Sequence, residues 1–178
     1  MAEIPSAQPI GHLPGGESIE VFTLSGSGGL TMKVITLGGI VTHLTVPDRR
    51  GDVADVVLGF DDPSRYLGPH PYFGAIVGRV AGRISAARFT LDGHPYLLAC
   101  NEPPNHLHGG VRGFDKHVWT ANPFVRPDGA SSLRLSRTSR DGEEGYPGTV
   151  DISVTYSVTS ANEFVIESEA TADRATPF

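Results

Sequence analysis

The chain has 178 residues, of which 39% are hydrophobic and 19% are charged. This composition is typical of a globular protein and argues against a disordered chain. The net charge is −6, and Arg49 and Arg50 are the only adjacent pair among the 14 basic residues. Nucleic-acid binding needs clustered Lys and Arg, so the charge favours a neutral or small polar ligand and no nucleic-acid partner.

Neither a secretion signal nor a membrane span is visible in the sequence. The N-terminus lacks a charged region followed by an apolar run, and no stretch approaches the length of a span. We therefore expect a cytoplasmic protein with no membrane partner. Its one cysteine, Cys100, excludes an intrachain disulfide. The neighbours Leu97, Leu98 and Ala99 predict a buried thiol rather than a reactive one.

Short runs of alternating apolar and polar residues follow one another along the chain, separated by turns rich in Gly and Pro. This pattern predicts strands, with one short helical turn at residues 64–67. No repeat or linker divides the sequence, so we expect a single domain over residues 1–178 with an all-β, antiparallel sandwich or barrel fold. The expected strands are residues 20–24, 30–37, 40–46, 53–58, 88–91, 95–99, 118–121, 132–139, 149–159 and 163–172.

Turn residues predict two hairpins and one open edge. Asp92-Gly93 supplies positive φ angles at little cost, and residues 159–162 join the last two expected strands. Pro95 has no N–H for a ladder, so it should lie at the start of a strand or at an edge. The clean alternation of residues 163–170 has no following segment to cover it. We therefore expect an open sheet edge there, through which the chain would self-associate.

Two arginines, Arg79 and Arg83, lie four residues apart in a segment of small and apolar residues. A guanidinium stays charged and carries five donors. At least one of the two must therefore pair with acceptors or face a polar cleft. From spacing alone, the favoured interpretation is a structural arginine that bridges loop carbonyls or a carboxylate.

Two histidines, His106 and His108, flank a leucine and precede two glycines that would let the backbone approach a ligand. In an extended segment the two imidazoles would share a face, which suggests half of a cupin-like metal site with His117 nearby. Further ligands with clear spacing are missing. The alternative is that one histidine is a loop residue and the other packs with a hydrogen bond. Composition leaves a functional role for His108 open.

An acidic turn, D-G-E-E-G-Y-P-G, occupies residues 141–148. Paired carboxylates can serve acid–base chemistry. Adjacent glutamates in a Gly/Pro loop are nevertheless more typical of solvated side chains, and this is the favoured interpretation.

Taken together, these segments resemble the aldose 1-epimerase family. Each block alone is a weak signal, but their common order and spacing are highly specific, and the match runs from about residue 15 to the C-terminus. The blocks are residues 38–41, 46–48, 57–60, 78–84, 105–110 and 113–116, Trp119 and residues 141–148.

The resemblance implies an isomerase with a galactose mutarotase-like β-sandwich and a carbohydrate cleft. Such enzymes interconvert the α and β anomers of hexoses such as glucose and galactose through the open-chain aldehyde, without a metal or organic cofactor. A Glu takes the proton of the anomeric hydroxyl and a His protonates the ring oxygen, while an Arg and a second His bind the sugar. The resemblance assigns these last two roles to Arg83 and His108. A fixed guanidinium and imidazole would stabilise negative charge as it moves between the C1 and ring oxygens.

Two departures from the family pattern matter. Gly82 stands where the family usually has Asn, so the expected sugar-binding group Gly82, Arg83 and His108 lacks one polar side chain. Residues 175–177 resemble the lead-in to the segment with the catalytic His, which implies that the general acid and base lie beyond Phe178 and that the sandwich is incomplete. The second hypothesis is therefore a non-catalytic carbohydrate-binding module that retains Arg83 and His108.

Overall fold

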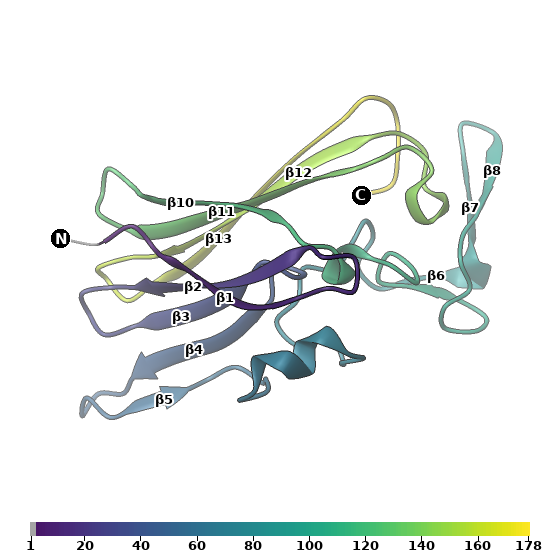
Figure 1. Cartoon of the computed structure of the whole chain (residues 1–178). Helices are drawn as coiled ribbons and strands as arrows, with labels where there is room; N and C mark the ends of the chain where they lie inside the picture. Colours follow the sequence, from purple (N-terminus) through teal and green to yellow (C-terminus); the bar gives the residue numbers. More distant parts are fainter. Residues whose placement is uncertain (1–2) are drawn as a thin grey trace.

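The structure, a computed structural model, describes residues 3–178 and is built from antiparallel strands (Figure 1). Two larger sheets pack face to face, and two short two-stranded sheets lie at one end. The all-β prediction is confirmed. Among residues 3–178, no helix has the length and apolar character needed to cross a membrane. The helical elements of the described residues are short 3₁₀ helices: η1 (Pro63–Leu67), η2 (Ser85–Ala87), η3 (Phe114–Lys116) and η4 (Glu143–Gly145).

The first sheet has five strands in the order β1-β2-β3-β4-β5. Alternation along β2 and β3 turns Phe22, Leu24, Met32 and Val34 toward the second sheet, where they are buried. The strands are β1 (Ala7–His12), β2 (Ser18–Ser25), β3 (Thr31–Ile35), β4 (Val41–Pro47) and β5 (Val53–Asp55).

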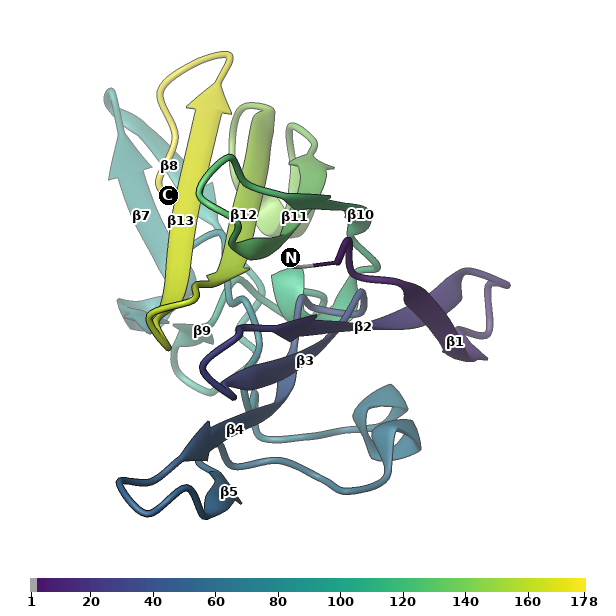
Figure 2. The same cartoon turned by 90° about the vertical axis from the view of Figure 1, so that its left-hand side faces the viewer.

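The second sheet has the order β10-β11-β12-β13 and supplies the other half of the core. Leu133, Leu135 and Val154 pack against the first sheet, and the Tyr156 hydroxyl donates to the Gly39 carbonyl at 3.0 Å. Figure 2 shows β13 at the border of this sheet, where β12 is its one partner strand among residues 3–178. The expected open edge is therefore present. The strands are β10 (Thr120–Val125), β11 (Ser131–Ser139), β12 (Val150–Val158) and β13 (Phe164–Ala172).

The two short sheets carry the segments between the large ones. β6 (Arg83–Ile84) pairs with β9 (His106–Leu107), and β7 (Arg88–Leu91) forms a hairpin with β8 (His94–Leu97) that projects from the sandwich (Figure 1). Asp92 and Gly93 have φ angles of 50° and 78°, which confirms the predicted hairpin turn. Pro95 lies in a strand of this two-stranded sheet, where both strands are edges.

The predicted environment of Cys100 is wrong, because the thiol is exposed. The segment that follows β8 leaves the hairpin without entering either large sheet. Of the apolar neighbours that suggested burial, Leu98 is buried but Leu97 is 77% exposed.

Candidate functional site

Arg79 has a purely structural environment. Its side chain is buried, with only 4% of the residue exposed, and all five of its N–H donors bind acceptors of the chain. The favoured interpretation from spacing, an arginine that bridges loop carbonyls, is therefore confirmed for Arg79. The acceptors are the Ser139 hydroxyl and carbonyl, the Arg140 and Pro147 carbonyls and the Thr176 hydroxyl, at 2.8–3.2 Å.

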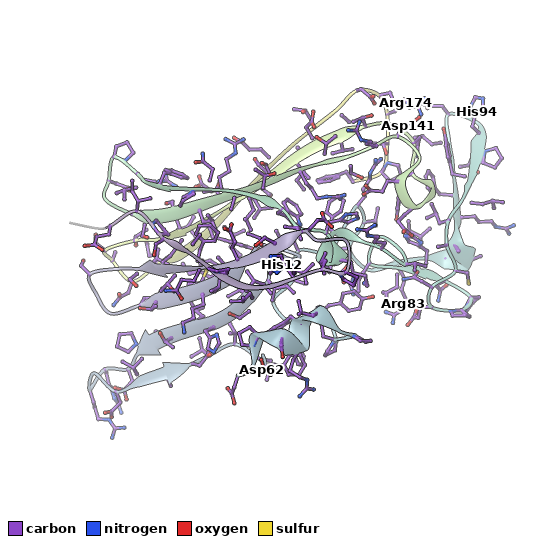
Figure 3. The ribbon with its side chains drawn as sticks, in the orientation of Figure 1. His12, Asp62, Arg83, His94, Asp141 and Arg174 are labelled. Carbon is purple, nitrogen blue, oxygen red and sulfur yellow. The ribbon has the colours of Figure 1, made fainter. Side chains whose placement is uncertain are left out.

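Arg83, by contrast, lies on the surface at the end of the molecule that carries the short sheets (Figure 3). Its Nε and Nη2 donate to the two carboxylate oxygens of Glu102 at 2.6 and 2.5 Å. These hydrogen bonds raise the pKa of Arg83 and lower the pKa of Glu102. Glu102 therefore remains a carboxylate that holds the guanidinium in place, and Nη1 still offers both of its N–H groups to a ligand.

Gly82 and His108 are joined by main-chain and side-chain hydrogen bonds. The Gly82 N–H donates to His108 Nδ1 at 3.1 Å, and the His108 N–H donates to the Gly82 carbonyl at 2.9 Å. Because Nδ1 is an acceptor here, the proton of the neutral imidazole lies on Nε2, which can donate to a ligand oxygen. The β6–β9 ladder thus brings together Gly82, Arg83 and His108, the three residues expected to bind sugar.

The loop around His108 is held from both sides. The Asn101 amide donates to the Leu107 and Gly110 carbonyls at 2.9 and 3.0 Å and accepts from the Leu107 N–H at 2.8 Å. The Glu144 carboxylate accepts from the N–H groups of Val111 and Arg112 at 2.9 Å each. These contacts fix the backbone that carries the imidazole.

The sequence analysis favoured solvated glutamates in the acidic turn. The structure shows instead that both glutamates of this turn hold neighbouring segments in place. Glu143, next to Glu144, pairs through both oxygens with Arg137 at 3.0 and 2.9 Å and accepts from the Ser139 hydroxyl at 2.7 Å. The fold brings the loop of Val111 and Arg112 next to Glu144, and the strand residue Arg137 next to Glu143.

The two histidines do not form the shared face that suggested a metal site. His106 is fully buried, its Nδ1 donates to the Ala99 carbonyl at 2.8 Å, and its Nε2 accepts from the Tyr146 hydroxyl at 2.8 Å. Burial raises the pKa of Tyr146 to about 12, so the hydroxyl remains a donor. His108 has a φ of 50°, which ends the extended alternation. Within residues 3–178, no group of three or more His, Cys, Asp or Glu side chains is arranged to hold a metal ion.

Three residues of the site were not predicted from the sequence: Tyr72, Glu102 and Glu144. The charge of the two glutamates was a signal, but their partners lie 19 and more positions away. Tyr72 has a φ of 61°, and its ring centroid lies 4.8 Å from that of His108. No local sequence pattern predicts this contact, because only the tertiary fold brings the two rings together.

The amino-acid sequence of the chain is similar to the sequences of characterised proteins. The family model described as aldose 1-epimerase matches residues 20–178. Galactose mutarotase from Sus scrofa is 50% identical over 168 residues, which cover 94% of this chain and 47% of that protein. Aldose 1-epimerase from Escherichia coli K12 is 32% identical over 164 residues, which cover 92% of this chain and 46% of that protein.

Solved structures show the same similarity. A galactose 1-epimerase from Lactobacillus acidophilus matches with a TM-score of 0.85 and 25% identity, over 97% of this chain and 49% of that one. An aldose epimerase homologue from C. elegans matches with a TM-score of 0.78 and 31% identity, over 94% and 47%. The chain thus spans about half the length of the relatives it matches. With a family match over most of its length, the chain belongs to the aldose 1-epimerase family.

Proposed function

We propose that the chain binds an aldohexose such as glucose or galactose through Arg83 and His108, as the sugar-orienting part of an aldose 1-epimerase. The observation that carries this proposal is the pair of hydrogen bonds between Gly82 and His108. They tie the imidazole of His108 to the residue next to Arg83 in the chain, although His108 and Arg83 come from different segments.

The two donors suit the chemistry of ring opening. Opening and closing the hexose ring moves negative charge between the C1 oxygen and the ring oxygen. Donors that are already fixed stabilise such charge without reorganising at the moment of reaction. Glu102 fixes Arg83, while Gly82 and Tyr72 fix the imidazole of His108.

The nearby ionisable groups are poorly suited to proton transfer, which requires a free acid and a free base. The pKa of Glu102 is lowered by its bonds to Arg83. Both ring nitrogens of His106 are engaged, and Glu144 accepts two main-chain N–H groups. We therefore expect the 178-residue chain alone to bind sugar without substantial epimerase activity, since an acid and a base each contribute roughly 10²- to 10⁴-fold. The same observation favours the second candidate, a non-catalytic carbohydrate-binding module.

Two measurements test the proposal together. Calorimetric titration with galactose should give saturable heat for the wild-type chain and at least about tenfold weaker binding for Arg83→Ala and His108→Ala. Arg88→Ala, which removes an exposed arginine from the neighbouring hairpin, is the matched control. In polarimetry on freshly dissolved α-glucose, the wild-type chain should not raise the rate of mutarotation above the rate in buffer alone.

Absence of saturable heat at millimolar sugar would remove the binding proposal. A wild-type chain that clearly outpaces buffer, with the difference abolished in both variants, would instead show that an acid and a base are present in these 178 residues.

A further inference from the structure

Lys116 lies close to the imidazole of His108 and is connected to it through an aromatic ring. It is one of two lysines in the sequence, the other being Lys33. The Lys116 ammonium lies 5.0 Å from the centroid of the Tyr72 ring, and this centroid lies 4.8 Å from that of the His108 imidazole. A cation within about 6 Å of an aromatic ring centroid, over its face, is attracted by the ring electrons. The three side chains therefore form one series of contacts that ends at His108.

A buried carboxylate fixes the position of this ammonium. The Asp115 side chain is only 2% exposed, and its Oδ2 accepts from Lys116 Nζ at 2.6 Å. Its Oδ1 has no hydrogen-bond partner among residues 3–178, so the ion pair with Lys116 is what stabilises the buried charge. A lysine that moved away would leave this carboxylate unpaired. The ammonium is therefore held beside the Tyr72 ring.

The segments that carry the lysine and the tyrosine are both anchored to the turn between β3 and β4. Gly38 of this turn donates its N–H to the His117 carbonyl at 2.8 Å, one residue beyond Lys116. Val41, where β4 begins, donates its N–H to the Gly74 carbonyl at 3.0 Å, two residues beyond the tyrosine. The two side chains thus have a common base in the first sheet, which is separate from the β6–β9 ladder.

The hydrogen bonds with Gly82 leave one movement of the imidazole unrestrained. They hold Nδ1 and the backbone of His108, but a ring held through one nitrogen can still tilt about that bond. The Tyr72 ring is inclined at 60° to the imidazole and limits this tilt. Tyr72 has a φ of 61°, which is uncommon for a bulky residue and persists where surrounding contacts impose it.

We infer that Lys116 and Tyr72 are positioning residues that direct the Nε2 donor of His108 toward the sugar, while Asp115 holds the ammonium. Neither positioning residue has to touch the sugar for this role. The inference rests on the proposed function of His108, but the orientation of the imidazole can be measured without a ligand.

NMR of the imidazole nitrogens in the full chain, labelled at histidine, tests the inference without sugar. His108→Gln identifies the His108 signals among those of the seven histidines. At mildly alkaline pH the wild type should show one tautomer, with the proton on Nε2. Tyr72→Leu and Lys116→Met should shift and broaden these signals, because the ring gains freedom to tilt. Tyr72→Phe and Lys116→Arg keep the ring and the charge, and should preserve the signals. Lys33→Met, which removes an exposed lysine on β3, is the matched control.

Calorimetric titration with galactose measures the consequence for binding. Lys116→Met should weaken the affinity about two- to fivefold and Tyr72→Leu about two- to tenfold, with Lys33→Met unchanged. Should Lys116→Met unfold because Asp115 is left unpaired, the double variant Asp115→Asn, Lys116→Met also removes the buried charge. It should shift and broaden the His108 signals in the same way.

The outcomes separate this inference from the proposed function. His108 signals at their wild-type positions in Tyr72→Leu and in the folded Lys116 variant would overturn the inference. So would equal changes in Lys33→Met, or wild-type affinity for galactose in both variants despite shifted signals. Shifted signals in the two variants, with no saturable galactose binding by the wild type, would overturn only the proposed function.

Discussion

Gly82 and His108 hold one another in place across 26 positions of sequence. One hydrogen bond sets the tautomer of the imidazole and the other sets the path of the backbone beneath it. Both bonds use main-chain atoms of Gly82, so a side chain at this position is not needed to orient His108. The φ of Gly82 is 87°, in the left-handed region that Gly tolerates best and Asn next best.

Gly82→Asn should therefore still fold, with some backbone strain at this positive φ, and should bind galactose more tightly. A Cβ at position 82 would meet no atom within 4 Å. The new amide would add a hydrogen bond at the sugar site, worth about 0.5–1.5 kcal/mol, or roughly a two- to tenfold gain in affinity. Calorimetry measures the change. Gly93→Asn is the matched control, with a φ of 78° and equal open space in the β7–β8 hairpin. An equal effect of the two substitutions would contradict a specific role for position 82.

Substitution by Lys should affect different properties at the two arginines of the same segment: stability at Arg79 and sugar binding at Arg83. Arg79→Lys leaves at least two of five buried bonds unmade, and we expect the free energy of unfolding to fall by about 2–4 kcal/mol. Arg83→Lys should leave stability almost unchanged but weaken galactose binding, because Lys cannot pair with Glu102 through a planar fork. Urea unfolding and calorimetry on both variants check this. Equal losses of stability would refute the assigned environments.

The long strands could be predicted because their pattern is local. Alternation predicted the strands that became β2, β3, β11, β12 and β13, because apolar and polar residues alternate along each of them. β10 was expected at residues 118–121 but occupies Thr120–Val125. Pro123 concealed its second half, and this proline is tolerated because β10 is an edge strand. β1 was missed for a similar reason, since Pro9 and Gly11 interrupt its pattern at a bulge.

The site itself depended on contacts that no periodicity encodes. β6 and β9 have two residues each, too few to show alternation, yet their pairing brings Arg83 opposite Leu107. Resemblance to a family supplied Arg83 and His108, while the supporting contacts of Tyr72, Glu102 and Glu144 come from tertiary structure alone.

Glu143 should make stability sensitive to acid. Burial alone would raise its pKa, but the hydrogen bonds from Arg137 and Ser139 outweigh burial and lower the pKa below its ordinary value of 4.5. A lowered folded-state pKa means that the carboxylate stabilises the fold above about pH 4.5, and that this contribution is lost as the pH falls through the folded-state pKa.

The expected result is a pH-dependent gap between wild type and Glu143→Gln. At pH near neutral the variant should be less stable by about 1–2 kcal/mol, and the gap should shrink steadily as the pH is lowered below 4.5. Urea unfolding across this range measures it. Glu17→Gln, which removes an exposed carboxylate, controls for net charge. A gap that stays constant with pH would contradict the assigned role of Glu143.

The open edge of β13 offers a template for a second copy of the chain. The strand pairs with β12 alone among the described residues, and Ile166 is 59% exposed on it. Charge does not protect the edge, because Glu167 pairs with Arg126 at 2.5 Å and Glu169 pairs with Arg134 at 3.1 Å. Glutamates that are paired with arginines repel an approaching strand less than unpaired glutamates would.

We therefore expect the chain to dimerise through β13, and Ile166→Lys to shift it toward monomer. An unpaired lysine on an edge strand is a common protection against strand addition, because pairing would desolvate its charge. Sedimentation velocity over a range of protein concentrations measures the equilibrium. Leu97→Lys is the matched control, since Leu97 is 77% exposed on β8, away from this edge. A wild-type chain that stays monomeric throughout, or an equal effect of both lysines, would show that β13 is not the interface, because only contact along this strand makes its exposed isoleucine matter more than a still more exposed leucine elsewhere.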